Sequence, residues 1–434
     1  MSTEDIKRNV LESVEKHRDE IIDLAATMVR QPSVNPDLEP GAAGEREAQE
    51  WLRDWLERTG SVDDIDFWAD DPDRPNFVGR RRGSGNGRSL TFSGHMDVVP
   101  VTPDQREQWT LGGPFSGDIQ DGNLRGRGTS DMKGAIAAYM MAAKILHESG
   151  VRLAGDLILA QASGEESGQH EIGCDTVLER GWTSDLAIFP EPTNFKTYPT
   201  LKGEIYFRLM THGKSTHIAN RYMVAQPLPH GVERPGISAI DKMLKYQLAI
   251  LDLERDWALH RSHPAVSPGG QFVNINTISG GASFTSIPDS CEATGSLLYN
   301  PDLTSNDVIS ELQAAIDRVT AGDSWLSEHP PEVEIPFMGL LKEPVNMEWD
   351  HPGVETIAST TEAVLGFTPE TATSPWVCDA NFWFPKGQPS LCFGPGDPTW
   401  GIHGTNEYIP VEELIKACKV FAILAIDWCG VDEQ

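Results

Sequence analysis

The 434-residue sequence has few cysteines and no long apolar run. Its six cysteines are scattered without a CxxC pair, which argues against a disulfide framework or a thiolate zinc site and favours buried, reduced thiols. No apolar run approaches the ~20 residues that a membrane span needs, and the first residues lack the apolar core of a secretion signal. We therefore expect a soluble, cytoplasmic protein that does not act at a membrane.

Positive charge is also scarce. Lys and Arg number 35 against 65 Asp and Glu, which gives a formal net charge of −30. A surface this negative repels phosphate backbones and anionic lipid, so nucleic-acid binding is excluded as the main task. Only 13 of the basic residues are lysines. An acidic surface that is poor in lysine suits a protein that works in a very salty cytoplasm.

The order of apolar segments predicts an α/β fold with an inserted domain. Buried strands alternate with helices over residues 1–200, which indicates a mostly parallel sheet that is covered on both faces. Residues 201–321 have the order strand, helix, strand, strand, helix instead, which indicates a compact α+β insertion. Residues 322–434 are expected to return to the first domain. The clearest elements of that domain are helices over 5–30 and 132–148 and strands at 89–93, 156–160, 186–189 and 389–393.

Acidic and histidine side chains follow directly after the predicted strands. They are His95 and Asp97, then Glu165 and Glu166, then Glu191, then His403, with Asp131 in a glycine-rich loop before a helix. Ligands bind at the carboxyl ends of the strands in an open α/β sheet, so we expect these groups to meet. Two imidazoles with several carboxylates suit Zn²⁺, with Co²⁺ or Mn²⁺ as alternatives. Five ligands exceed one tetrahedral site, which favours two ions that share a carboxylate.

Neighbouring residues in these segments have separable roles. His95 and Asp97 face the same way in extended chain, so the Asp97 carboxylate could accept the spare imidazole N–H. Glu165 and Glu166 point in opposite directions, so one can bind metal while the other stays free as a general base. A water activated by metal and by such a base is the machinery for hydrolysing an amide.

Five segments resemble, in the same order, the signature segments of the dizinc amidohydrolases that include acetylornithine deacetylase, succinyl-diaminopimelate desuccinylase, aminoacylase and glutamate carboxypeptidase. The segments are GHMDVVP (94–100), GRGTSDMKG (126–134), GEESG (164–168), EPT (191–193) and HGTNE (403–407). The resemblance covers nearly the whole chain. It implies a zinc-exopeptidase-like catalytic domain and a ferredoxin-like inserted domain that acts as a lid and mediates homodimerisation.

The resemblance also implies a role for each residue of the site. Asp131 would bridge two Zn²⁺ ions in each subunit, with His95 and Glu191 completing one site and Glu166 and His403 the other. Glu165 would be the general base, and Asp97 would orient the His95 ring. His217, in the segment GKSTH (213–217), matches a lid histidine that reaches the partner subunit's active site and stabilises the oxyanion.

The substrate is less well defined. Glu191 stands where aminopeptidase-like relatives carry Asp, which resembles the deacylase and carboxypeptidase branch. Thr285 stands where many relatives have Asn, and Leu298 where they have an Arg that grips a substrate carboxylate. Leu cannot bind a carboxylate, so either the substrate lacks one or another cation supplies the contact. Arg221 and Arg234 could supply it, although a solvated loop is an equal alternative.

The leading prediction is a metal-dependent deacylase that cleaves a small N-acyl amino acid or related amide through a metal-bridging water activated by Glu165. The alternatives are a dipeptidase or carboxypeptidase of the same family and a catalytically silent binding or scaffold homologue. Retention of the five ligands and the base argues against the silent alternative. The lid shows no obvious Lys/Arg cluster for a phosphate, which argues against a phosphoesterase.

Overall fold

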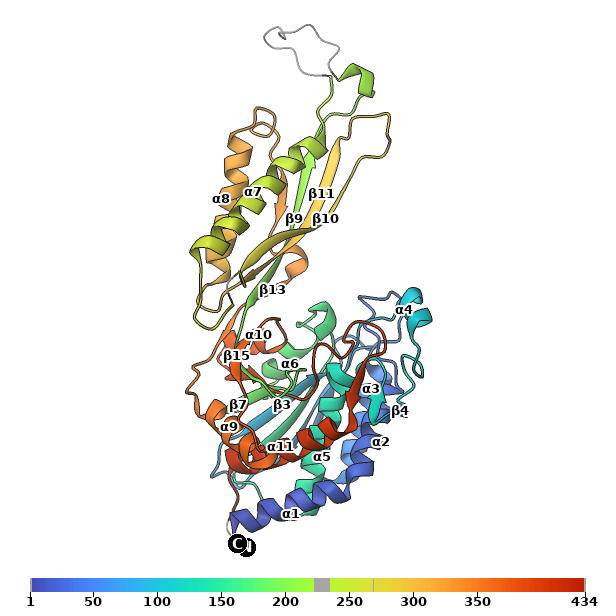
Figure 1. Ribbon diagram of the computed structural model, residues 1–434, viewed down its shortest axis with the longest axis vertical. Coiled ribbons are helices and arrows are strands. Elements are labelled where there is room, and N and C mark those ends of the chain that lie inside the picture. Colours follow the sequence, from blue (N-terminus) through green and yellow to red (C-terminus); the bar gives the residue numbers. More distant parts are fainter. Residues whose placement is uncertain (1, 222–234, 268, 433–434) are drawn as a thin grey trace. The chain divides into compact units, whose positions relative to one another are not determined.

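The computed structural model describes residues 2–221, 235–267 and 269–432, and the chain forms two compact units (Figure 1). The first unit consists of Met1–Thr200, Met347–Ser374 and Cys378–Gln434, and the second of Leu201–Asn346 with Pro375–Val377. Residues 322–346, which the sequence pattern placed in the first domain, therefore belong to the second unit. The reason is that two short strands in this segment pair with the strand Gly203–His212 of the second unit.

The predicted α/β class is confirmed, and the main sheet of the first unit is parallel at its centre. Strands β6, β3, β7 and β16 run parallel to one another, whereas β1, β2 and β8 are antiparallel to their neighbours. In sheet order the strands are β1 (Asp64–Trp68), β2 (Asn76–Arg81), β6 (Leu157–Ala162), β3 (Leu90–His95), β7 (Leu186–Phe189), β16 (Ser390–Cys392) and β8 (Thr197–Leu201). Strand β15 (Thr371–Ser374) pairs with β8. Every residue of β3 and β6 is buried, as expected for strands that are covered on both faces.

Helices cover this sheet (Figure 1). Helices α5 and α11 pack against each other and against β3, with α1 and α2 in contact with both, while α6 contacts β2 and β6. The helices of this unit are α1 (Thr3–Lys16), α2 (Arg18–Val29), α3 (Arg46–Thr59), α4 (Pro103–Gln108), α5 (Gly134–Glu148), α6 (Cys174–Glu179), α9 (Pro352–Leu365), α10 (Ala380–Trp383) and α11 (Val411–Cys429). The single helix predicted over 5–30 is divided, because the chain leaves helical geometry at His17 (φ −95°, ψ 13°).

The second unit has the β-α-β-β-α-β order of a ferredoxin-like domain. Its antiparallel sheet runs in the order β10-β11-β9-β12, and β13 also pairs with β9. Buried and half-buried residues alternate along β9, so one face of the sheet forms the core under the two helices. The elements are β9 (Gly203–His212), α7 (Ala239–His260), β10 (Phe272–Gly280), β11 (Ser290–Tyr299), α8 (Ser305–Ala321), β12 (Glu332–Glu334) and β13 (Leu341–Lys342).

Two further observations bear on the sequence predictions. All six cysteines are buried and unpaired, as expected for reduced thiols. Among the residues that the structure describes, no helix has the length and hydrophobicity needed to cross a membrane.

Candidate metal centre

The five predicted ligands all lie in the first unit, and four of them follow the carboxyl ends of its parallel strands. His95 is the last residue of β3, Glu166 lies in the turn Glu165–Ser167 just after β6, and Glu191 follows β7 by one residue. His403 lies in the loop after β16, and Asp131 lies just before α5. Parallel strands end at one edge of the sheet, which is why segments so distant in sequence converge.

These side chains form two groups that share Asp131. His95, Asp131 and Glu191 bring ligand atoms within 4.8 Å of one another, and so do Asp131, Glu166 and His403. The two Asp131 oxygens point to different groups. Oδ1 lies 3.2 Å from His95 Nε2, and Oδ2 lies 3.4 Å from His403 Nε2. In the second group, His403 Nε2 is also 3.1 Å from Glu166 Oε2.

Burial, hydrogen bonds and nearby charges shift the pKa values of the ligand side chains. Burial acts most strongly and lowers the pKa of His95, but the contacts with Asp131 and Asp97 and the nearby carboxylate charges together raise that pKa well above its usual range. Burial and the nearby Asp131 charge raise the pKa of Glu166 to about 7, and burial raises that of Glu191 well above its usual range. The hydrogen bond to Asp131 raises the pKa of His403 to about 10. Without a cation, the cluster holds protons that metal binding would release.

The donor set fits divalent ions. Each group offers one imidazole nitrogen and two carboxylates, the borderline ligands that suit Zn²⁺, Co²⁺ or Mn²⁺. Asp131 presents one oxygen to each group, which is the arrangement a bridging carboxylate requires. These residues could therefore hold two ions.

The Asp97 carboxylate has a different main contact from the one predicted. His95 Nδ1 lies 3.0 Å from the main-chain oxygen of Asp97 and 3.6 Å from its carboxylate. The carboxylate instead accepts the backbone N–H groups of Gly164, Glu165 and Glu166 at 3.1, 3.3 and 3.0 Å. Asp97 thus fixes the His95 ring through its backbone and the Glu165–Ser167 turn through its side chain.

A buried ion pair connects two of the motifs, and neither of its residues was predicted to belong to the site. Arg127 donates from Nη1 to Glu407 Oε2 at 2.7 Å and from Nη2 to the Gly404 carbonyl at 2.8 Å. Glu407 Oε1 accepts the backbone N–H groups of Ser130 and Asp131 at 3.0 and 3.3 Å. The pair therefore joins the loop of Asp131 to the loop of His403. Its only sequence signal was membership of the motifs GRGTSDMKG and HGTNE.

The remaining predicted residues belong to the second unit. His217 is exposed, its Nδ1 accepts the N–H of Ala219, and its backbone bridges to Ser286, next to Thr285. Arg221 forms an ion pair with Asp241 near the start of α7. Leu298 is half-buried on β11. Arg234 lies outside the described residues.

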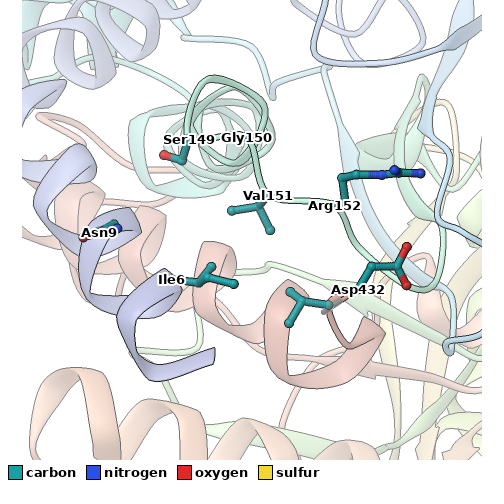
Figure 2. Close-up of a pocket in the computed structure, with 8 residues that line it drawn as sticks. Ile6, Asn9, Ser149, Gly150, Val151, Arg152 and Asp432 are labelled. Carbon is teal, nitrogen blue, oxygen red and sulfur yellow. The ribbon is translucent and has the colours of Figure 1, made fainter. Parts of the chain in front are cut away.

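A cavity of about 210 Å³ is present elsewhere in the first unit, and Figure 2 shows the residues that line it. It is lined by Ile6 and Asn9 of α1, residues 149–152 after α5, and Val431 and Asp432. The turn after α5 leads into the amino end of β6, so this cavity lies at the sheet edge opposite the metal ligands. It contains none of them.

Characterised proteins resemble the chain over almost its full length. A deformylase of N-formyl-4-amino-5-aminomethyl-2-methylpyrimidine from Halalkalibacterium halodurans is 30% identical, and the match covers 97% of each chain. A succinyl-diaminopimelate desuccinylase from Parvibaculum lavamentivorans is 29% identical over 92% of this chain and 93% of its own.

Solved structures share the fold. A dipeptidase from Saccharomyces cerevisiae superposes with a TM-score of 0.75 over all of both chains at 15% identity. A dinuclear metal-binding peptidase from Bacillus subtilis gives a TM-score of 0.62 at 16% identity, covering 95% of this chain and 98% of its own. The model of peptidase family M20/M25/M40 matches residues 91–427. The protein is therefore a member of this peptidase family, whose hydrolases act on amide bonds.

Proposed function

We propose that the protein is a deacylase that hydrolyses the amide of a small N-acylated amine with two divalent metal ions, Zn²⁺ in the first instance. The observation that carries this proposal is the pair of ligand groups joined by Asp131, with Glu165 directly before the ligand Glu166 in the same turn. His95 and Glu191 would complete one site, and Glu166 and His403 the other. Bound there, the ions supply Lewis acidity that polarises the amide carbonyl and lowers the pKa of water.

Glu165 is the general base of the proposed reaction. It is half-buried in the turn after β6 and directly precedes the ligand Glu166, and its charge acts to raise the pKa of His95 and of Glu191, the partners of Asp131 in the first ligand group. Its neighbour Glu166 faces the other group. A Glu165 carboxylate oxygen would take a proton from the attacking water and deliver it to the amide nitrogen as the amine leaves.

The substrate we favour has a small acyl group and no carboxylate near the second unit. Leu298 occupies the position at which the resemblance implies a carboxylate-binding Arg, and its side chain offers no hydrogen-bond donor. The substrate named for the deformylase relative is an N-formyl aminomethylpyrimidine, whose name includes no carboxylate. Both observations favour formamides of neutral amines over N-acyl amino acids.

The test is release of free amine from matched pairs of substrates. The panel contains N-formyl and N-acetyl aminomethylpyrimidines, the same acyl groups on amino acids, N-succinyl amino acids and dipeptides. Each is assayed before chelation, after chelation and after restoring Zn²⁺, Co²⁺ or Mn²⁺. We expect metal-dependent turnover that is fastest on the carboxylate-free formamides. Turnover of dipeptides alone would replace the deacylase with a dipeptidase, and no turnover with metal bound would favour a silent homologue.

The role of Glu165 is tested separately. Glu165→Gln should lower kcat by about 10²- to 10⁴-fold, the usual contribution of a general base, while the metal content stays unchanged. Glu171→Gln is the matched control, because Glu171 is 64% exposed and lies a few residues further along the same loop. Equal activity of the two variants would exclude Glu165 as the base.

A further inference from the structure

A buried network of polar side chains lies behind the turn that carries Glu165. Its centre is Arg74, which lies in the loop between β1 and β2. Arg74 is only 2% exposed. Glu45, fully buried, accepts hydrogen bonds from Arg74 Nε at 3.0 Å and from Nη2 at 2.8 Å. The paired contact fixes the plane of the guanidinium. Nη1 of the same group is thereby directed to the Asp37 carboxylate, with which it forms an ion pair.

Asp37 connects Arg74 to the Glu165–Ser167 turn. The Asp37 oxygen that binds Arg74 also accepts the Ser167 hydroxyl at 3.0 Å. Asn35 donates from Nδ2 to Asp97 at 2.7 Å and to Ser167 at 3.1 Å, and its Oδ1 accepts the N–H of Asp37. The segment containing Asn35 and Asp37 therefore contacts the end of the turn at Ser167 directly and its beginning through the Asp97 carboxylate.

The guanidinium also lies directly against the turn. Gly164, which precedes Glu165, has φ +89°, and a Cβ at this position would lie 3.3 Å from Arg74 Nη2. The adjoining Ser163 donates from its hydroxyl to the Pro75 carbonyl at 2.8 Å. Arg74 thus contacts the turn through its side chain and through the loop that bears it. The network residues 35, 37, 45 and 74 all precede residue 91, where the family match begins.

We propose that Arg74 is a positioning residue for Glu165: its guanidinium, oriented by Glu45, holds Asp37 and so fixes the Glu165–Ser167 turn. The inference rests on the proposed role of Glu165 as the base. Small errors in the placement of a reacting group cost large factors in rate, and a displacement of about 1 Å can cost ~100-fold. Loss of Arg74 should therefore act on kcat, because the five ligands and Glu165 itself are all retained, and the metal content, to which Glu166 of the same turn contributes, should stay unchanged.

The test is a double-mutant cycle in the full-length protein. Arg74→Gln should lower kcat by about 10- to 100-fold with KM changed less than about twofold. In the Glu165→Gln background, the same substitution should change the residual kcat less than about twofold, because the group that Arg74 positions is already gone. Equal losses in both backgrounds would overturn the proposal. Arg82→Gln is the control, since Arg82 pairs with Asp64 but is 60% exposed.

A second readout needs no substrate. In Arg74→Gln the backbone amides of residues 164–166 should exchange hydrogen faster than in the wild type, while those of α11 should not change. Unaltered exchange at residues 164–166 would overturn the proposal. This result does not depend on whether the protein is a deacylase. Should Arg74→Gln not fold, Asp37→Asn gives the same two measurements with the Arg74–Glu45 pair intact. A smaller effect in the same direction is then expected, and its absence would overturn the proposal.

Discussion

Asp131 is the residue that makes one centre out of two groups of ligands. Its two oxygens lie near different histidines, and it is only 13% exposed. His95 and Glu191 belong only to the first group, and Glu166 and His403 belong only to the second. The consequences of losing a ligand should therefore differ between the shared residue and the others.

The first prediction concerns metal stoichiometry. Asp131→Asn should reduce bound metal at both sites, because an amide offers a single weak acceptor oxygen in place of two anionic ones. Glu191→Gln should reduce bound metal at one site only. Metal content per chain after equilibration with Zn²⁺ and gel filtration measures both variants. A loss of only one ion in Asp131→Asn would contradict the bridging role.

At the residue scale, the convergence of the predicted ligands could be foreseen where a motif coincides with the end of a strand. The positions of His95, Glu166 and Glu191 follow from the rule that parallel strands end at one edge. The contact of the Asp97 carboxylate could not be found in this way, because its acceptor atoms bind backbone groups of residues 164–166. The contacts of Arg74 were equally hidden, since sequence spacing carries no information about side chains that meet from different loops.

At the scale of elements, one aspartate connects α7 of the second unit to the segment just after α8. Asp323, just after α8, is buried and forms ion pairs with Lys242 and Lys245 of α7 at 2.8 and 2.6 Å. It also accepts the N–H groups of Trp325 and Leu326. Burial acts to raise the pKa of Asp323, but the two lysines and the two backbone N–H groups together lower that pKa well below its usual range.

The second prediction follows from the sign of this shift. A depressed carboxyl pKa stabilises the folded state above the ordinary value of 3.8, and the contribution is lost as the pH falls through the folded-state value. Asp323→Asn should thus lower the free energy of unfolding by about 2 kcal/mol at pH 7. The difference from the wild type should shrink below pH 3.8. Urea unfolding followed by tryptophan fluorescence measures it, and a difference independent of pH would contradict the assignment.

Apolar periodicity predicts most elements correctly. It fails where contacts with other parts of the chain decide how an element ends or to which unit it belongs. The split at His17 interrupts one continuous apolar pattern. Strands β12 and β13 are three and two residues long, too short for a period of two to be recognised, yet their pairing with β9 places them in the second unit. Long or fully buried elements such as α5, β3 and β6 were found near their observed positions.

At the scale of the whole molecule, the net charge of −30 has a measurable consequence. Like charges repel in the compact state, and salt screens them with a Debye length of about 10 Å at 0.1 M and about 3 Å at 1 M. We therefore predict that the melting temperature rises with KCl, most steeply below about 0.5 M. Sucrose at equal osmolarity is the control for effects other than screening. A stability optimum at low salt would contradict this prediction and the inference of a salty habitat.

The fourth prediction concerns the proposed homodimer through the second unit and the action of His217 in trans. Neither His217→Ala nor Glu165→Gln alone should retain full activity. Mixing the two variants under conditions of subunit exchange should restore activity, because one site of each mixed dimer then has both groups. Analytical ultracentrifugation of the wild type gives the mass in parallel. A monomer mass, or the absence of complementation in a dimer, would contradict action in trans.

The sequence by itself determined the α/β class, the inserted domain and the identity of the five candidate ligands, because strand and helix periods and local motifs are properties of contiguous residues. Tertiary structure decided which atoms face one another. It assigned one oxygen of Asp131 to each group, turned the Asp97 carboxylate to the Glu165–Ser167 turn and placed Arg74 behind that turn. The physical reason is that hydrogen bonds and ion pairs depend on distances between residues far apart in the chain, which only packing fixes.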